Sequence, residues 1–344
     1  MIDQPLSNIL WLACLFASAF FLTLVLTAYL RRYALASSML DIPNQRSSHS
    51  VPTPRGGGVA VVVSLVLAAG LMYWLNLLAA TLSLPILVSG GVVAIVGFLD
   101  DHGHIAARWR LLAHFSAAIT AVYWLGGLPP IELLGAELPS GVGYVVAVLL
   151  LVWMLNLYNF MDGIDGIAGI QAITTCVGGA ILYVVVGQPA MGELAIVLAC
   201  SVAGFLVWNF PPARIFMGDA GSGFLGFVLG VFALQAGWVQ SELFFSWLIL
   251  LGVFVVDATL TLLVRLLRGE RVYEAHRSHA YQHAALKYGS HLTVSLTVLL
   301  INILWLFPLA YLVAMQRIND LLGLSIAYMP LVFVALKFRA GRPT

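Results

Sequence analysis

Long apolar runs separated by short polar loops fill almost all of this chain of 344 residues. A helix needs about 20 residues to cross a hydrocarbon core about 30 Å thick. On this basis the sequence predicts eleven membrane-spanning helices, at residues 9–30, 57–76, 79–99, 111–127, 141–158, 166–186, 192–210, 222–239, 243–266, 291–314 and 321–337. Only 9% of the residues are charged and 61% are hydrophobic, whereas about 25% of the residues of a soluble domain are charged. The predicted fold class is therefore an all-α, polytopic integral membrane protein with a single transmembrane domain over residues 1–344.

The Lys and Arg residues predict the orientation, because these residues gather in cytoplasmic loops. If the amino terminus lies outside, fifteen of the sixteen fall on one face, and only Arg317 falls on the other. Residues 1–8 contain no basic residue and the first apolar run is too long for an export signal, so this run is expected to remain as a helix. We therefore predict a periplasmic amino terminus and a cytoplasmic carboxyl terminus. The basic residues form no single patch, so nucleic acid is not expected as a partner.

Most Asp residues fall on the cytoplasmic side of this predicted topology. The inner set is Asp41, Asp100, Asp101, Asp162, Asp165 and Asp219. Only Asp257 lies within a predicted span, roughly 21 Å from its start at about 1.5 Å per residue. A transporter more often places ionisable groups near the bilayer midplane and repeats its motifs between halves, which the Asp-bearing segments do not do. The distribution favours an enzyme with an active site built from cytoplasmic loops, with a transporter or flippase of an anionic lipid or solute as the alternative.

The segment of residues 159–166 lies between two apolar runs and contains Asn159, Asp162 and Asp165. If the segment is helical, the two carboxylates stand three residues apart and point to one side, which Gly163 and Gly166 keep open. This arrangement suits a cation or a polar ligand. A polar loop in which Asp165 caps the following helix is the alternative.

Two further inner loops carry carboxylates. Asp100 and Asp101 follow a predicted span, and adjacent carboxylates are tolerated where a metal shares the site or where one of them acts as a base. Asp219 precedes a predicted helix start, where backbone amides could hold a diphosphate beside a metal, although simple helix capping is the alternative. Oxygen ligands without cysteine favour Mg²⁺ over zinc, with His102 and His104 as bystanders.

Two basic loops are candidates for phosphate binding. In residues 47–58, Arg55 precedes three glycines whose backbone amides could approach a phosphate. Residues 270–283 combine arginines with His276, His279 and His283, which suit phosphate binding or proton transfer. Solvated basic loops that follow the orientation rule are the alternative for both.

Together these motifs resemble those of the polyprenyl-phosphate N-acetylhexosamine-1-phosphate transferases, or glycosyltransferase family 4. The matching features are the Asp100-Asp101 pair, residues 159–166, residues 216–222 and the histidine-rich loop, in this order, within core motifs at residues 46–283. The chain looks similar to the bacterial branch that initiates O-antigen and related lipopolysaccharide or surface-polysaccharide synthesis on undecaprenyl phosphate.

The resemblance implies transfer of an N-acetylhexosamine 1-phosphate from a UDP-sugar to undecaprenyl phosphate, with release of UMP, at the cytoplasmic face of a bacterial inner membrane. The donor would be UDP-N-acetylglucosamine or a 6-deoxy relative such as UDP-N-acetylfucosamine. The implied cofactor is Mg²⁺, with Mn²⁺ as a substitute. The resemblance also leaves room for a homodimer and for downstream glycosyltransferases as partners.

The resemblance also implies roles for individual residues. Asp219 would be the principal metal ligand, and Asp100 and Asp101 would supply a base or a further metal contact. The nucleotide pocket would be lined by Asn159, Asp162 and Asp165, with Phe216 stacked on uracil and Asn209 nearby. The phosphates would be held by Arg55, His276 and His279. Two features depart from the family pattern: the histidines are spread over residues 276–283, and the lysine after the Asp pair is missing, with Arg108 and Arg110 as the nearest cations.

Overall fold

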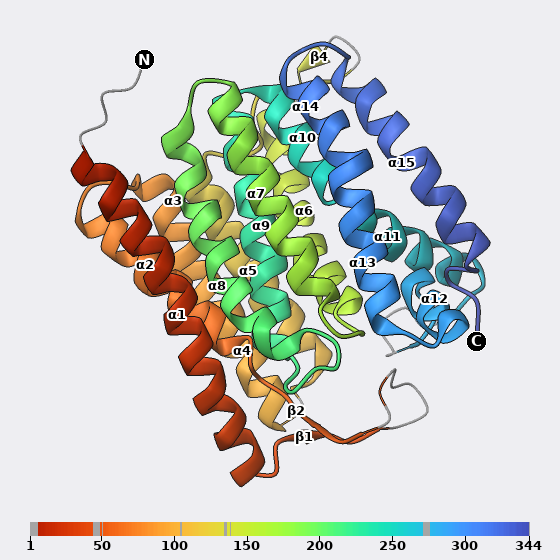
Figure 1. Ribbon diagram of the computed structural model, residues 1–344. Helices are drawn as coiled ribbons and strands as arrows, with labels where there is room; N and C mark the ends of the chain where they lie inside the picture. The colour runs from red at the N-terminus through yellow and green to blue at the C-terminus, as the bar shows by residue number, and fades with distance from the viewer. Residues whose placement is uncertain are drawn as a thin grey trace.

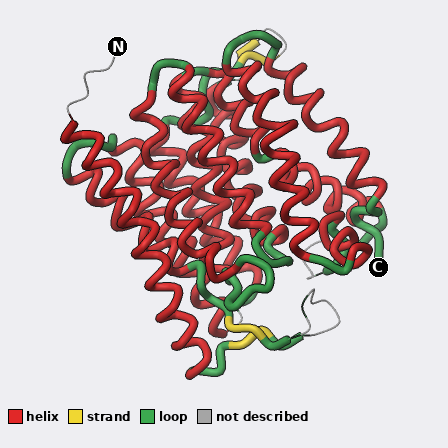
Figure 2. Tube along the Cα trace, in the orientation of Figure 1, coloured by secondary structure: helices red, strands yellow, loops and turns green. Residues whose placement is uncertain are grey.

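The structure is a computed structural model that describes residues 6–43, 49, 51–103, 105–133, 136–137, 139–270 and 276–343. Across these ranges the chain forms a bundle of helices with two short β-hairpins (Figures 1 and 2). Residue 46 at the start of the core motifs, residues 47, 48 and 50 of the first basic loop, His104 and residues 271–275 of the histidine-rich loop lie outside the described residues.

The amino-terminal half contains α1 (Leu6–Ala36), β1 (Leu40–Asp41), β2 (Thr53–Pro54), α2 (Val59–Trp74), α3 (Ala80–Leu84), η1 (Pro85–Gly90), α4 (Gly91–Gly103), α5 (Ala107–Leu125), β3 (Glu132–Leu133), β4 (Ala136–Glu137) and α6 (Ser140–Met161). The carboxyl-terminal half contains α7 (Ile167–Val185), η2 (Pro189–Gly192), α8 (Glu193–Asn209), α9 (Asp219–Val239), α10 (Ser241–Leu250), α11 (Gly252–Leu267), α12 (Ala280–Tyr288), α13 (His291–Ile301), η3 (Asn302–Leu306), α14 (Phe307–Ala314) and α15 (Asp320–Lys337). The hairpins β1–β2 and β3–β4 are antiparallel and lie toward opposite ends of the bundle (Figure 1).

The helices confirm the predicted all-α polytopic membrane class. Within the described ranges, eight helical segments are long and apolar enough to span a membrane, and the bent pair α10–α11 makes nine if it is counted as one span. The other two predicted spans are also helical, as the shorter apolar helix α2 and as α5. The count of eleven and the orientation remain predictions.

Helix α9 lies at the centre of the bundle. Its first residue is Asp219, one of the predicted site residues. Within its most apolar stretch of 18 residues, 83% of the residues are buried, whereas only 17% are buried in the corresponding stretch of α1. Neighbouring backbones come close because glycine stands at the contacts: a Cβ atom on Gly97 of α4 would lie 2.6 Å from the Ala220 nitrogen of α9. This close approach brings Asp101, one turn beyond Gly97, to the first residues of α9.

The predicted span at residues 243–266 is not one straight helix. Helices α10 and α11 meet at an angle of 72°. The Leu250 carbonyl oxygen beside the break accepts hydrogen bonds from Gln171 Nε2 at 2.9 Å and Thr175 Oγ1 at 3.3 Å. Because side chains of α7 satisfy this carbonyl, the chain can break its helix inside the bundle without a proline.

The orientation can be tested with reporters at the two ends of the chain. Alkaline phosphatase, which is active only after export, is expected to be active when fused before Met1 and inactive when fused after Thr344. A green fluorescent protein at the same two positions should give the reverse pattern. Activity of the same reporter at both ends would contradict the odd number of spans.

Candidate functional site

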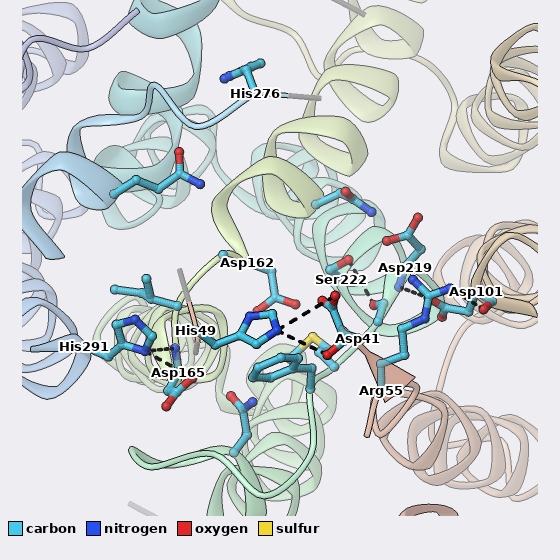
Figure 3. A pocket seen from close by; sticks show the side chains of 18 residues that line it. Asp41, His49, Arg55, Asp101, Asp162, Asp165, Asp219, Ser222, His276 and His291 are labelled. Atoms are coloured by element: carbon cyan, nitrogen blue, oxygen red, sulfur yellow. Dashed lines mark hydrogen bonds and ion pairs between the residues drawn. The ribbon is translucent and has the colours of Figure 1, made fainter. Parts of the chain in front are cut away.

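A central cavity of about 380 Å³ opens at the end of the bundle where β1 and β2 lie (Figure 3). Segments far apart in the chain supply its walls, including the ends of α6 and α8, the start of α9 and the turn after α6. The lining residues are Asp41, His49, Arg55, Asp101, Asn159, Asp162, Gly163, Ile164, Asp165, Asn209, Phe216, Met217, Gly218, Asp219, Ser222, His276, Gln282 and His291. All predicted site residues except Asp100 and His279 therefore face one space.

The start of α9 is held by a carboxylate from another helix. Asp101 Oδ1 accepts the backbone N–H of Asp219 at 3.1 Å, and Asp101 Oδ2 accepts that of Ala220 at 3.3 Å. These two amides have no partner within their own helix, and a carboxylate is favourable at a helix amino terminus. Gly218, with φ of +79°, leaves room for this contact, since a Cβ there would lie 2.7 Å from Asp101 Oδ2. Asp101 thus fixes the position of Asp219.

Arg55 contacts the same carboxylate region from the segment after β2. Its Nη2 donates a short hydrogen bond to the Asp101 carbonyl oxygen, and its Nε lies 3.9 Å from Asp101 Oδ1. The Arg55 side chain is 31% exposed, so part of the guanidinium faces the cavity. The predicted phosphate-binding cation is therefore at the cavity wall, beside Asp219.

A side cavity of about 190 Å³ adjoins the central cavity, because Asn159 and Asp219 line both. Its remaining lining residues come mainly from apolar positions of α4, α5, α6 and α9: Val93, Val96, Gly97, Asp100, Ala107, Arg110, Leu111, His114, Leu155, Asn156, Phe160 and Gly223. Asp100, which sequence reasoning grouped with Asp101, lies here. The side cavity thus joins apolar walls to a charged inner end.

Arg110 is the cation at that charged end. Its Nη1 makes a short ion pair with Asp100 Oδ2 and lies 3.7 Å from Asp219 Oδ2. Arg108 lies over the Trp109 ring instead, with its Cζ atom 5.6 Å from the ring centroid. Of the two cations nearest to the missing family lysine, Arg110 is the one that reaches the Asp residues.

The segment of residues 159–166 is not helical throughout, which corrects the conditional prediction above. Helix α6 ends at Met161, residues 162–166 form a turn, and Gly166 adopts φ of +76° before α7. Asp162 and Asp165 still face the same cavity. Burial raises the pKa of Asp162 well above its usual value, and the nearby Asp219, Asp165 and Asp101 carboxylates raise it further. A cation placed here would relieve this repulsion.

Asp165 is held by neighbours that favour its ionised form. His291 Nδ1 lies 3.2 Å from Asp165 Oδ1, and the Ala213 backbone N–H donates to Asp165 Oδ2 at 3.0 Å. Burial alone would raise the pKa of Asp165, but these two contacts outweigh burial and lower that pKa. Asn209 fixes the same turn, because its Oδ1 accepts the Gly166 N–H at 3.0 Å.

The predicted uracil platform, Phe216, already has an aromatic neighbour. The His49 ring meets Phe216 edge to face, with centroids 4.8 Å apart, and His49 Nε2 lies 3.3 Å from the Asp41 carbonyl oxygen. Asp41 and His49 therefore line one face of the pocket beside Phe216, a position that sequence reasoning did not assign to either residue.

The two predicted histidines of the last inner loop have different surroundings. His276 lines the central cavity and stacks on His279 with centroids 4.9 Å apart. His279 is 2% exposed and lies beneath it, with Nδ1 3.5 Å from Asp257 Oδ1. The structure therefore brings His276, but not His279, into the cavity lining.

The described residues could hold a divalent cation only if substrate phosphates supply part of its ligands. The described residues contain no preassembled group of three or more His, Cys, Asp or Glu ligands. Mg²⁺ is usually bound by one or two carboxylates together with substrate phosphates. Asp219, whose side chain is 37% exposed at the junction of the two cavities, suits that mode, whereas Asp101 is occupied by amides and Asp100 by Arg110.

Sequence reasoning did not assign Asp41, His49, Gln282 and His291 to the site. His49 stood in a loop already singled out for phosphate binding. His291 had a weaker signal: it begins an apolar run after Ser290, whose side chain caps α13 by accepting the Thr293 N–H. A lone histidine at the start of a predicted span could have been noted, but its contact with Asp165 depends on distant packing.

Comparison with known proteins gives matches over most of the chain. A family model described as glycosyl transferase family 4 matches residues 83–237. The probable undecaprenyl-phosphate N-acetylglucosaminyl 1-phosphate transferase of Bacillus subtilis (strain 168) is 29% identical over 325 residues, covering 91% of this chain and 87% of the relative. The decaprenyl-phosphate N-acetylglucosaminephosphotransferase of Mycobacterium tuberculosis (strain H37Rv) is 30% identical over 332 residues, covering 84% and 79%. The phospho-N-acetylmuramoyl-pentapeptide-transferase of Moorella thermoacetica is 31% identical over 271 residues, covering 73% and 82%.

Proposed function

The chain belongs to glycosyl transferase family 4, and from this membership we propose that it transfers an N-acetylhexosamine 1-phosphate from a UDP-sugar to undecaprenyl phosphate, releasing UMP. UDP-N-acetylglucosamine is the first candidate donor, because two of the relatives described above carry N-acetylglucosamine in their names. UDP-N-acetylfucosamine is the second. The lipid product would start an O-antigen or a related surface polysaccharide at the cytoplasmic face of a bacterial inner membrane.

The observation that carries this proposal is the junction of the two cavities at Asn159 and Asp219. A reaction between a water-soluble nucleotide and a membrane lipid needs a polar site and an apolar site that meet at the reacting phosphates. The central cavity supplies carboxylates, histidines and Phe216, and the side cavity supplies aliphatic walls with Arg110 at their end. This pairing suits the two substrates better than either cavity does alone.

In the proposed reaction, an oxygen of the lipid phosphate attacks the β-phosphorus of the UDP-sugar. The bond from that phosphorus to the bridging oxygen breaks, and UMP leaves with the electron pair. Arg110 would hold the lipid phosphate as its dianion, which has no proton to lose, and the catalytic role of Asp100 would be to hold the Arg110 guanidinium in place. Arg55 and His276 would hold the diphosphate, while Asp165 and Phe216 would hold the uridine. Phosphoryl transfer needs such alignment and charge neutralisation more than it needs covalent catalysis.

We assign Mg²⁺ to Asp219, because its carboxylate lies where both cavities meet. When bound, the metal would neutralise charge on the diphosphate. Activity is therefore expected to disappear in EDTA and to return on addition of Mg²⁺ or Mn²⁺. Undiminished activity in EDTA would contradict the assignment of a metal to the reaction.

The proposed function is tested with purified protein, undecaprenyl phosphate and Mg²⁺, by measuring UMP release from UDP-N-acetylglucosamine, UDP-N-acetylfucosamine and UDP-N-acetylgalactosamine. UMP should form with at least one donor and only when the lipid is present. A transporter or flippase would bind the lipid without releasing UMP. UMP release at the same rate without the lipid would point to a hydrolase and would contradict the proposal.

His291→Ala is expected to make the KM for the UDP-sugar depend on pH between about pH 5 and about pH 8. In the wild type the pKa of Asp165 lies below its usual value, so the carboxylate stays ionised over this range. Without His291, only the Ala213 N–H and the nearby His49 still oppose burial, so Asp165 takes up a proton at a higher pH than in the wild type, and KM should rise on the acidic side. His283→Ala is the control, because His283 is half-buried, lines neither cavity and contacts the Arg342 carbonyl oxygen. Equal pH profiles for the two variants would contradict the assignment.

A further inference from the structure

Asp257 is a buried carboxylate that lies outside both cavities. It is 6% exposed and stands on α11, beyond the bend that follows α10. Its Oδ1 accepts the Ala280 backbone N–H at 2.9 Å, and its Oδ2 accepts the Tyr281 N–H at 2.9 Å. Thr261 Oγ1 adds a third hydrogen bond at 3.1 Å. Asp257 therefore caps the amino terminus of α12 from a different helix.

Helix α12, which Asp257 caps, contacts the wall of the central cavity through Tyr281 and Gln282. The Tyr281 hydroxyl donates to the Phe160 carbonyl oxygen at 2.9 Å, in the last turn of α6. The turn after α6 packs against the same hydroxyl, since a Cβ on Gly163 would lie 2.1 Å from it. Gln282, the next residue of α12, lines the cavity directly. A shift of α12 would thus displace the segment that carries Asn159 and Asp162.

We propose that Asp257 is a positioning residue, which holds α12 so that Tyr281 fixes the end of α6 and the turn bearing Asn159 and Asp162. The bend between α10 and α11 directs α11 toward α12, and the hydrogen bonds from Gln171 and Thr175 to the Leu250 carbonyl stabilise this bend. Asp101 holds α9 by the same device. The starts of α9 and α12 therefore both support the central cavity. Each start is held by hydrogen bonds to a buried carboxylate of a neighbouring helix.

The kinetic test rests on the proposed function and uses Asp257→Asn, Tyr281→Phe and the double variant. Asparagine keeps the size of Asp257 but directs an NH₂ group at one of the two backbone N–H groups. Phenylalanine removes only the hydroxyl. Each change is expected to raise the KM for the UDP-sugar about tenfold, since a displacement near 1 Å is enough to weaken a site strongly. The double variant should be no worse than the poorer single variant, because both act through one chain of contacts.

Tyr328→Phe is the matched control. The Tyr328 hydroxyl also donates to a backbone carbonyl, that of Leu248, at 2.7 Å, but it lies on α15 away from both cavities. Its KM should equal that of the wild type. A purely structural role for Asp257 would reduce the active fraction and leave KM unchanged in every variant. That result, or multiplicative losses in the double variant, would overturn the proposal.

Amide hydrogen exchange provides a readout that does not need activity. Exchange of residues 160–166 should become faster in Asp257→Asn and in Tyr281→Phe, but not in Tyr328→Phe. If the wild-type protein releases no UMP, the proposed function fails, while the exchange rates still decide whether Asp257 positions this segment. Unchanged exchange in Tyr281→Phe would contradict the inference, even where Asp257→Asn fails to fold.

Discussion

Asp219→Asn is expected to lower kcat by roughly a hundred- to a thousandfold, which corresponds to on the order of 3 to 4 kcal/mol of lost transition-state stabilisation. Asp219 is the first residue of α9 and lines both cavities. Asparagine keeps the size of the side chain but removes the negative charge that we propose binds the metal. The backbone should stay in place, because Asp101 holds the Asp219 N–H and not its side chain.

The measurement is steady-state UMP release over a range of UDP-sugar and Mg²⁺ concentrations. Asp165→Asn is the comparison: it should raise KM more than it lowers kcat, because the uridine is held alike in the ground and transition states. A kcat near the wild-type value for Asp219→Asn at low Mg²⁺ would reject the metal assignment. The metal would then have to be sought near Asp100 and Asp101.

Arg110→Gln is expected to reduce kcat/KM for undecaprenyl phosphate about thirtyfold, with little change in KM for the UDP-sugar. A hydrogen bond to a charged group contributes about 1.5 to 3 kcal/mol, and we take about 2 kcal/mol because the Arg110 side chain is 37% exposed and partly screened. Glutamine retains a donor but loses the charge that would attract the lipid phosphate. Asp100 would also lose its ion-pair partner.

Arg108→Gln is the control for Arg110, since it removes the same charge from the first turn of the same helix, α5. The Arg108 guanidinium lies over the Trp109 ring instead of reaching Asp100 or Asp219, so the kinetics of this variant toward the lipid should stay close to the wild type. Losses of equal size in the two variants would mean that the start of α5 attracts the lipid through its overall positive charge. In that case the assignment of the side cavity to the lipid phosphate would be wrong.

The membrane class and most of the candidate site could be predicted because both depend on local sequence features. The apolar runs give the helices, and the Asp residues at one set of helix ends must meet when those helices pack side by side. This reasoning placed Asp101, Asp162, Asp165 and Asp219 on one side, and the structure brings all four to one cavity.

The remaining features depend on contacts between distant segments. The bend at Leu250 has no proline signal and is stabilised by Gln171 and Thr175 of another helix. Asp257 was predicted to lie inside a span, and nothing near it in the sequence points to the start of α12 as its partner. The burial of His279 beneath His276 has the same origin, because spacing along a loop does not reveal which ring faces a cavity.

The most direct test of the proposed reaction follows the phosphorus atom itself. UDP-N-acetylglucosamine, or the donor that the UMP assay selects, is labelled with radioactive phosphorus at the β-position and incubated with the protein, Mg²⁺ and undecaprenyl phosphate. Transfer of a sugar 1-phosphate predicts that the label moves into the lipid fraction and that the released UMP is unlabelled. Label that leaves as UDP, while the sugar reaches the lipid without it, would contradict the account.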